Sequence, residues 1–148
     1  MVSFDTNVLV YATASISDVR VTRARDLIAR AMRAASSILL LQTLAEFSNV
    51  AIRTAIPVKD IRTTIDAWRA VLPVQAADDS DLLTALEAVR EHRLAFWDAM
   101  LWASARRAGV RHLLTEDLQD GFSLQGVTFI NPFNRENDLL IDEVLSPS

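Results

Sequence analysis

The chain has 148 residues, 51% of them hydrophobic and 23% charged, which is typical of one globular domain with its own core. It contains no cysteine, which excludes disulfides and thiolate chemistry, and no apolar run approaches the ~20 residues of a membrane span. The net charge of −4 does not suit a nucleic-acid binder unless the charge is unevenly distributed. Asp5 also interrupts any signal-peptide-like start, so we expect a cytoplasmic protein without a membrane partner.

The first predicted element is a short apolar strand over residues 2–4 that ends at Asp5. The chain then turns into a helix, for which Thr6 and Asn7 are good capping types. In parallel α/β sheets, ligands bind outside the carboxyl ends of the strands, so Asp5 is placed where chemistry can occur. A plainer interpretation is that Asp5 only caps the helix.

Residues 20–35 have helical periodicity, with one apolar face and one face that carries Arg23, Asp26 and Arg30. We expect the charged face to be solvated, and contact with RNA or a partner is the alternative. Residues 37–41 form a continuous apolar run, as in a strand buried on both faces. In the helix that follows, periodicity alone places Glu46 on the polar, solvent-facing side.

A helix over 58–70 leads to a third apolar run at 71–74, where Pro73 predicts an edge strand. Three acids come next, at the start of a helix over 82–89. Acids are favoured at the positive end of a helix, so we interpret these as structural. They are Asp78, Asp79 and Asp81.

Residues 94–105 form a helix with almost no polar face, which indicates burial. Asp98 lies near its start, where a carboxylate among apolar neighbours is costly unless it is paired, capping or bound to a metal. Asp98 therefore either caps this helix or points into a site.

A fourth strand over 110–114 ends at Thr115, and acids follow at Asp117 and Asp120. A single helical turn would present these two acids on one side. A fifth strand is predicted over 126–130. His112, inside the fourth strand, is interpreted as structural.

The alternation of strands and helices predicts an α/β fold with a parallel sheet of about five strands in the order 3-2-1-4-5, flanked by helices. In that order, Asp5 and Asp117 lie side by side at the carboxyl edge, and the helix of Asp98 leads toward it. Carboxylates so gathered repel one another by about 4 kcal/mol per pair at 4 Å and an effective dielectric constant of 20. A divalent cation relieves this repulsion, and all-oxygen ligation points to Mg²⁺ or Mn²⁺.

Four segments in this order resemble the acidic motifs of PIN-domain ribonucleases, and the likeness is greatest to VapC-type toxins of bacterial toxin–antitoxin pairs. They are residues 4–12, Glu46, residues 96–99 and residues 114–121. Each motif alone is weak, but four in order at these separations are a strong signal. The resemblance covers residues 2–133. We therefore expect a PIN-like nuclease domain over 1–133, with 134–148 as a C-terminal extension that many relatives would lack.

The resemblance implies a catalytic cluster of Asp5, Glu46, Asp98 and Asp117, with Asp5, Asp98 and Asp117 as ligands of Mg²⁺ or Mn²⁺. It implies supporting roles for the side chains of Thr6, Asn7, Thr115 and Asp120. Glu46 would then line the cleft, as a ligand or as the base that takes a proton from water. The implied reaction is metal-assisted hydrolysis of RNA phosphodiester bonds. The implied partners are a second copy of the chain and an antitoxin that blocks the cleft and alone confers DNA binding.

Other classes fit less well. A phosphotransfer receiver needs a lysine after a late strand, but the only lysine is Lys59, and a HAD-type phosphatase needs an acid where Asn7 stands. Three scattered glycines make no phosphate loop. A catalytically silent PIN-fold module that binds RNA or a partner is the main alternative.

Overall fold

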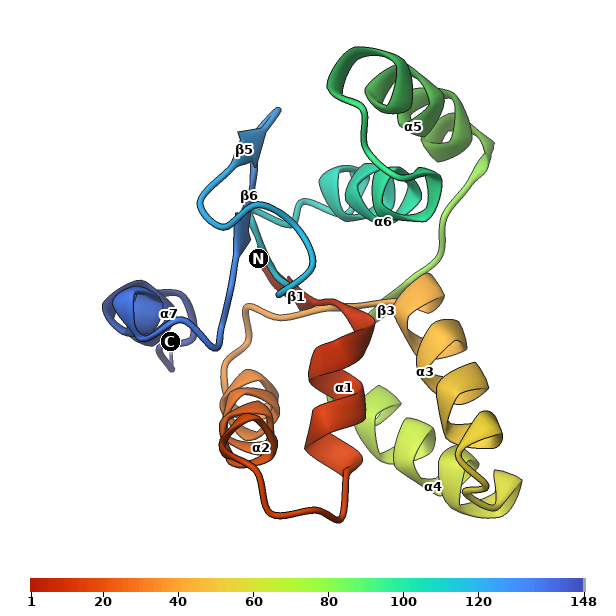
Figure 1. Ribbon diagram of the computed structural model, residues 1–148, viewed down its shortest axis with the longest axis vertical. Helices are drawn as coiled ribbons and strands as arrows, with labels where there is room; N and C mark the ends of the chain where they lie inside the picture. Colours follow the sequence, from red (N-terminus) through yellow and green to blue (C-terminus); the bar gives the residue numbers. More distant parts are fainter. Residues whose placement is uncertain (148) are drawn as a thin grey trace.

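The computed structural model describes residues 1–147, which form short strands and seven α-helices (Figure 1). The strands are β1 (Val2–Phe4), β2 (Leu39–Leu40), β3 (Val74–Gln75), β4 (His112–Leu114), β5 (Ser123–Leu124) and β6 (Val127–Ile130). The helices are α1 (Thr6–Thr13), α2 (Val19–Arg33), α3 (Leu41–Arg53), α4 (Val58–Arg69), α5 (Asp79–His92), α6 (Phe96–Arg107) and α7 (Asp138–Val144), and a 3₁₀ turn, η1 (Arg135–Asn137), precedes α7.

The centre of the fold is a parallel sheet in which β1 pairs with β4 and β4 pairs with β6. β2 and β3 form a parallel pair of their own, which an isolated parallel bridge between Val2 and Ser37 joins to β1. The strands thus follow the order β3-β2-β1-β4-β6, which confirms the predicted order once β6 is counted as the fifth parallel strand. β3 lies at the edge, as Pro73 predicted.

The sequence prediction missed one strand. β5 pairs antiparallel with β6 at the far edge of the sheet, through a two-residue turn at Gln125 and Gly126. Both turn residues have positive φ, the backbone conformation of a tight hairpin turn. Two residues are too few to show the alternation from which a strand is predicted.

Helices cover both faces of the sheet: α1 to α4 lie on one side and α5 and α6 on the other (Figure 1). Each face of the sheet packs against its own hydrophobic core. Alternate residues of a strand belong to different cores, because successive side chains on a strand point to opposite faces. Leu114 and Ile130 belong to the core under α1 to α4, whereas Leu113 and Phe129 belong to the core under α5 and α6. Burial on both faces explains why these strands are continuous apolar runs.

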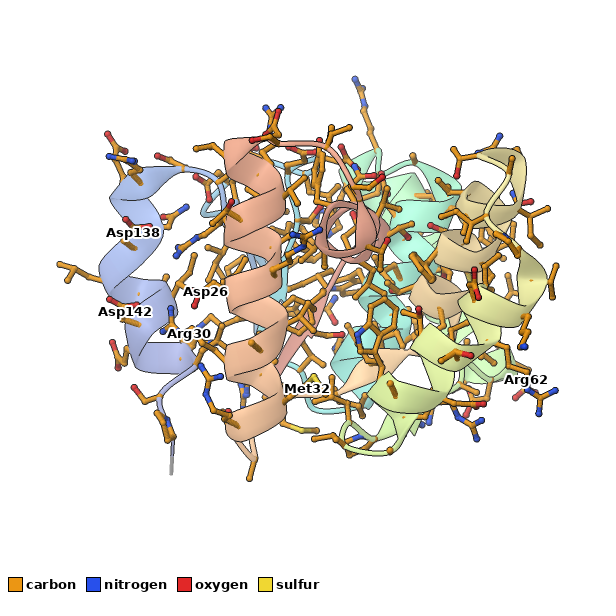
Figure 2. The ribbon with its side chains drawn as sticks, turned by 90° about the horizontal axis from the view of Figure 1, so that it is seen from below. Asp26, Arg30, Met32, Arg62, Asp138 and Asp142 are labelled. Atoms are coloured by element: carbon orange, nitrogen blue, oxygen red, sulfur yellow. The ribbon has the colours of Figure 1, made fainter. Side chains whose placement is uncertain are left out.

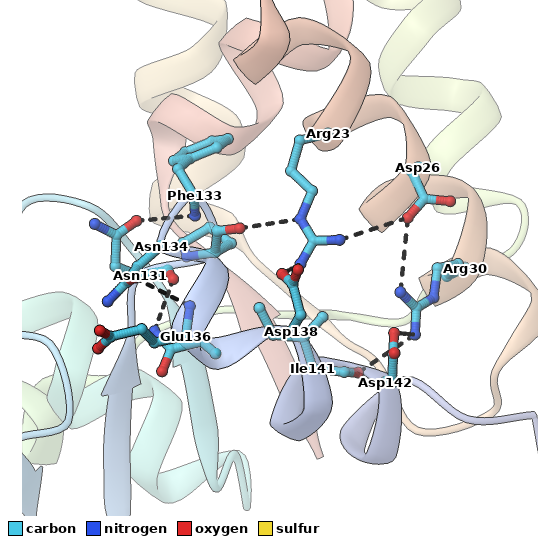
Figure 3. A network of polar contacts seen from close by, with 12 residues as sticks. Arg23, Asp26, Arg30, Asn131, Phe133, Asn134, Glu136, Asp138, Ile141 and Asp142 are labelled. Atoms are coloured by element: carbon cyan, nitrogen blue, oxygen red, sulfur yellow. Dashed lines mark hydrogen bonds and ion pairs between the residues drawn. The ribbon is translucent and has the colours of Figure 1, made fainter.

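The charged face of α2 is not solvated as predicted, because α7 packs against it (Figures 2 and 3). Arg23 Nη2 lies 2.9 Å from Asp138 Oδ1, and Arg30 Nη2 lies 3.0 Å from Asp142 Oδ1. Ile141 of α7 is fully buried in the same core as α2. The sequence set residues 134–148 apart only as an extension beyond the family resemblance, whereas the partner against which α7 docks depends on tertiary contacts. Ser148, the last residue of that extension, lies outside the described residues.

No helix within residues 1–147 combines the length and the apolar character needed to cross a lipid bilayer.

Candidate active site

Asp5 comes directly after β1 and begins α1, and it is only 6% exposed. Its Oδ1 accepts a hydrogen bond from the Thr6 amide at 2.7 Å, which makes it the N-cap of α1. Its Oδ2 accepts a hydrogen bond from Thr115 Oγ1 at 2.7 Å, because the β1–β4 pairing brings the ends of the two strands together. Asp5 therefore both caps the helix and faces the neighbouring strand end, so the two interpretations of this residue are compatible.

Asp117 lies in the loop after β4, beside the start of α1. Its Oδ2 accepts a hydrogen bond from Asn7 Nδ2 at 2.9 Å, and its amide donates to Thr115 Oγ1 at 3.2 Å. The Thr115 hydroxyl thus donates to Asp5 and accepts from Asp117, which fixes the two acidic segments relative to each other.

Glu46 reaches the same place from α3, although periodicity had placed it on a solvent-facing side. Thr6 Oγ1 donates to Glu46 Oε2 at 2.7 Å, and Gln42 Nε2 donates to Glu46 Oε1 at 2.8 Å. Sequence periodicity separates apolar from polar faces, but it does not distinguish a face that lines a site from one that meets bulk water. The motif resemblance therefore located Glu46 better than periodicity did.

Asp98 is in the first turn of α6, but it does not cap this helix. The N-cap position is Ala95, and no side chain caps the first turn. Within residues 1–147, the Asp98 carboxylate accepts no hydrogen bond and forms no ion pair, whereas Asp5, Glu46 and Asp117 are each held by neighbours. Asp98 is half-buried, so its charge is only partly hydrated. The cap interpretation is wrong, and the carboxylate is left free to bind something else.

Burial and the charges of neighbouring acids raise the pKa of Asp5, Asp98 and Asp117. Burial raises the pKa of Asp5, and the charges of Asp117 and Asp98 raise it further against the lowering effect of the hydrogen bonds from Thr115 and Thr6. Burial and the charges of Asp117 and Glu46 likewise raise the pKa of Asp98. Loss of hydration and the neighbouring Glu116 raise the pKa of Asp117. No arginine or lysine forms an ion pair with Asp5, Glu46, Asp98 or Asp117 in the described part of the chain, so this acidic cluster retains its mutual repulsion.

Asp120 is the one predicted site residue that does not contact this cluster. The expected helical turn is absent, because residues 116–121 form bends and a turn. The Asp120 carboxylate instead accepts hydrogen bonds from the Asn131 amide and from the side chains of Asn134 and Asn137, all at 2.9–3.0 Å. Burial alone would raise the pKa of Asp120, but these hydrogen bonds hold it below its usual range.

Sequence reasoning missed Gln42, which connects two of the acidic segments. Its Nε2 donates both to Glu46 Oε1 and, at 2.9 Å, to the main-chain oxygen of Trp97 next to Asp98. The signal was present, because Gln42 stands four residues before Glu46 and such pairs meet on a helix. An open groove of about 790 Å³ begins here; its lining includes Gln42, Glu46, Met100 and the 63% exposed Trp97.

The donor chemistry of the acidic cluster suits a hard divalent cation, since every candidate ligand is a carboxylate oxygen. Within residues 1–147, however, no group of three or more histidine, aspartate or glutamate side chains is arranged to hold a metal ion. Mg²⁺ does not require such a group, because it keeps several waters and is bound through one or two carboxylates plus substrate phosphates. The unpartnered Asp98 and the raised pKa values fit such an open site.

Solved structures of similar fold come from several bacteria. VapC20 of Mycobacterium tuberculosis, described as a sarcin–ricin loop cleaving toxin, matches with a TM-score of 0.64 and 19% identity over 79% of this chain and 92% of its own. A toxin–antitoxin complex from Klebsiella pneumoniae matches with a TM-score of 0.67 and 17% identity, over 90% and 99% of the two chains. FitAcB from Neisseria gonorrhoeae matches with a TM-score of 0.57 and 17% identity over the same shares. At these identities the likeness establishes the fold.

A comparison with curated protein sequences finds no match. The family model described as PIN domain matches residues 2–123, which include all four residues of the acidic cluster. With most of its length matched and the strand order and helices of this fold in place, the chain belongs to the PIN domain family.

Proposed function

We propose that this protein is a metal-dependent endoribonuclease that acts as the toxin of a type II toxin–antitoxin pair. The observation that carries this proposal is the convergence of four carboxylates, from β1, α3, α6 and the loop after β4, without a basic partner. Such an arrangement costs stability, so it is best explained by a cation that these residues bind.

Asp5, Asp98 and Asp117 would hold Mg²⁺ or Mn²⁺, directly or through water. When bound, the cation polarises a phosphate oxygen and lowers the pKa of a bound water so that it can attack the phosphodiester. The chain itself orients these acids: Thr115 holds Asp5, and Asn7 holds Asp117. Asp98 brings two carboxylate oxygens without protein partners, so it can bind without first giving up a hydrogen bond.

Glu46 would either bind the cation or take the proton of the attacking water. Thr6 and Gln42 each donate to one of its two oxygens, which fixes the plane of the carboxylate. A general base must be held within hydrogen-bond reach of the proton that it removes, and donors from two helices, α1 and α3, supply that constraint.

The partners proposed are RNA as substrate, a cognate antitoxin and a second copy of the chain. The toxin–antitoxin complex among the similar structures supports an antitoxin partner. This antitoxin would block the acidic cluster, and DNA would be bound only through it. Leu82, Leu83 and Leu86 are exposed on α5 and support a homodimer, since adjacent apolar side chains on a surface favour association.

Metal dependence is tested with the purified chain, freed of any antitoxin. It should cut RNA when Mg²⁺ or Mn²⁺ is present and stop when EDTA is added. Undiminished cleavage in excess EDTA would rule out the proposed chemistry. If the chain binds RNA with metal but releases it uncut, the silent PIN-fold module is the correct interpretation.

The toxin role is tested by expression of the chain alone. The native chain should arrest growth, whereas Asp5→Asn should not, because the amide keeps the helix cap and the shape but weakens the ligand set. Equal toxicity at equal protein level would show that cleavage is not the cause. Arrest should also be relieved by co-expression of a short reading frame found immediately upstream, which would identify the antitoxin.

A further inference from the structure

The loop that carries Asp117 has little main-chain support. The Thr115 amide bonds to the oxygen of Ile130 at 2.9 Å, and the Gly121 amide bonds to the oxygen of Phe129 at 2.8 Å. Between these two anchors, residues 116–120, here called the Asp117 loop, make no main-chain hydrogen bond to another element within the described chain. Side chains must therefore set the position of this loop.

Asp120 supplies the densest set of such contacts. Its Oδ1 accepts from the Asn131 amide at 2.9 Å and from Asn137 Nδ2 at 3.0 Å, and its Oδ2 accepts from Asn134 Nδ2 at 2.9 Å and from the same Asn137 nitrogen at 3.0 Å. All the donors belong to residues 131–145, here called the C-terminal segment. Hydrogen bonds to an ionised carboxylate are stronger than neutral ones, even where the group is exposed, as Asp120 is.

The C-terminal segment is itself fixed to the body of the fold (Figure 3). Arg23 Nε donates to the oxygen of Pro132 at 3.0 Å while its Nη2 pairs with Asp138, and Arg30 pairs with Asp142. Ile141 and Leu145 are buried at the same interface. The asparagines that hold Asp120 thus stand on a frame docked onto α2, not on a free tail.

The other end of the loop is held through the same region. Tyr11 Oη donates to Glu116 Oε1 at 2.9 Å, and the Tyr11 ring packs edge-on against Phe133 of the C-terminal segment with 5.3 Å between centroids. Arg20 Nε lies 3.5 Å from Glu116 Oε2. Glu116 and Asp120 flank Asp117 on either side, and both are linked to the C-terminal segment.

We infer that Asp120 is a positioning residue, through which the C-terminal segment fixes the Asp117 loop and with it one carboxylate of the acidic cluster. Asp120 is therefore neither a metal ligand nor a catalytic residue. Only the catalytic consequence of this inference rests on the proposed function, because the restraint on the loop is a property of the metal-free fold.

The test exchanges donor and acceptor across one contact. In Asp120→Asn, the new amide nitrogen faces Asn134 Nδ2, so two hydrogen-bond donors oppose each other. In Asn134→Asp, the new carboxylate faces the carboxylate of Asp120, so two negative charges oppose each other. In the double variant, the amide at position 120 donates to the carboxylate at position 134, and its oxygen still accepts from Asn131 and Asn137; only the second contact of Asn137, to the former Oδ2, is lost. Position 134 also keeps its acceptor for the Glu136 amide, now 3.1 Å away.

The first measurement is amide hydrogen exchange at Asp117 and Gly121 in the metal-free chain, because these amides donate to Thr115 Oγ1 and to the oxygen of Phe129. Each single variant should speed exchange there by about three- to tenfold, as expected for an exposed charge-assisted hydrogen bond, and the double variant should restore most of the protection. Glu143→Gln, which removes an exposed charge from the C-terminal segment without changing its contacts to α2 or to the loop, should leave exchange there unchanged. Unchanged exchange in Asp120→Asn, no rescue in the double variant, or an equal effect of Glu143→Gln would each overturn the inference.

The second measurement is RNA cleavage by the same four variants. A positioning role lowers kcat by a similar factor with little change in KM, and the double variant recovers it. If the exchange pattern holds but the native chain cuts no RNA, the proposed function fails and the restraint on the loop stands. If the native chain cuts RNA and Asp120→Asn cuts it equally well, Asp120 has no positioning role in catalysis.

Discussion

Two groups of acids in this protein differ in their partners: Asp78 and Asp81 at the start of α5 are paired with Arg107, whereas the acidic cluster has no basic partner within residues 1–147. At the start of α5, Asp78 caps the helix and its amide donates the reciprocal hydrogen bond to Asp81 Oδ2, which completes a capping box. Asp81 is only 2% exposed, and both of its oxygens lie 3.0 Å from Arg107 Nε. In the acidic cluster, Asp5 is almost as deeply buried, yet its partners are hydroxyl and amide groups without charge.

The difference separates a structural acid from a binding acid. Burial of a carboxylate is tolerated when a guanidinium neutralises it, and the group then serves the fold. Where several carboxylates gather without such a partner, the fold carries an unrelieved cost, and an external cation is the remaining source of compensation. Variants of the two groups should therefore fail in different assays.

The largest expected effect is on cleavage by Asp98→Asn. The carboxylate has no protein partner to lose among the described residues, so the variant should fold as the native chain does. Loss of a ligand charge should lower the cleavage rate by about a hundredfold or more, since each 1.36 kcal/mol of lost transition-state stabilisation costs about a factor of ten. Asp79→Asn, also in the first turn of its helix, is the matched control and should cleave normally in the same Mn²⁺ assay.

Next in size is a loss of stability in Asp81→Asn, with cleavage retained. A buried, charge-assisted contact to Arg107 is weakened, but Asp78 still lies 3.5 Å from Arg107 Nε, so we expect unfolding to become easier by about 1–3 kcal/mol. Thermal unfolding should show a drop of about 2–4 °C per kcal/mol for a chain of this size. A stable but inactive Asp81→Asn would contradict the division into structural and binding acids.

A smaller effect of opposite sign is expected for the melting temperature of metal-free Asp98→Asn. Loss of the favourable helix-dipole contact would cost about 0.3–1 kcal/mol, but the raised pKa of Asp98 shows that burial and repulsion outweigh it. When the pKa of Asp98 is higher in the folded chain than in the unfolded chain, its protonation favours folding. The stability that this contributes is fully present below the unfolded-state pKa of about 3.9, and it is lost as the pH rises through the folded-state pKa. The variant should therefore melt higher than the native chain at pH 7, and the gap should close toward pH 4. A variant that melts lower at pH 7 would refute the repulsion.

The smallest expected effect is that of Asp78→Asn, with the reverse dependence on pH. Hydrogen bonding to Ser80 chiefly, with the Asp81 amide and the charge of Arg107, lowers the pKa of Asp78 against the opposing loss of hydration. A lowered folded-state pKa gives stability that is present above the unfolded value and lost as pH falls. The variant should melt slightly below the native chain at pH 7, and the two should converge in acid. If the difference in melting temperature between the variant and the native chain were the same at every pH, the charge of Asp78 would add nothing to the cap.

Much of the architecture followed from local pattern. The apolar runs predicted β1, β2, β3, β4 and β6, and Pro73 predicted an edge strand, because strand burial and the missing proline donor are properties of a few adjacent residues. Helix starts were found within a few residues, as at α2 and α4. The two-residue β5 left no pattern to detect, and the first turn of α6 proved exposed at Phe96 and Trp97 although the helix as a whole is apolar.

The four acids of the cluster were chosen from sequence by strand-end logic and motif order, and the structure brings them within electrostatic reach of one another. Their partners could not be chosen in that way. The side chains of Thr6, Asn7 and Gln42 donate to carboxylate oxygens of the cluster. Which oxygen each of them reaches depends on how α1, α3 and the Asp117 loop are placed relative to one another, and packing across the sheet sets that placement.

What the sequence determined by itself is the order of the strands and the identity of the acids at their ends, because both follow from short-range periodicity and residue chemistry. The tertiary structure alone decided what each charge meets. Arg23 and Arg30, apparently solvated on their helix, bind α7, and Asp120 turns from the cluster to the asparagines of the C-terminal segment. Those contacts join residues 11 to 115 positions apart, a separation over which no local pattern carries information.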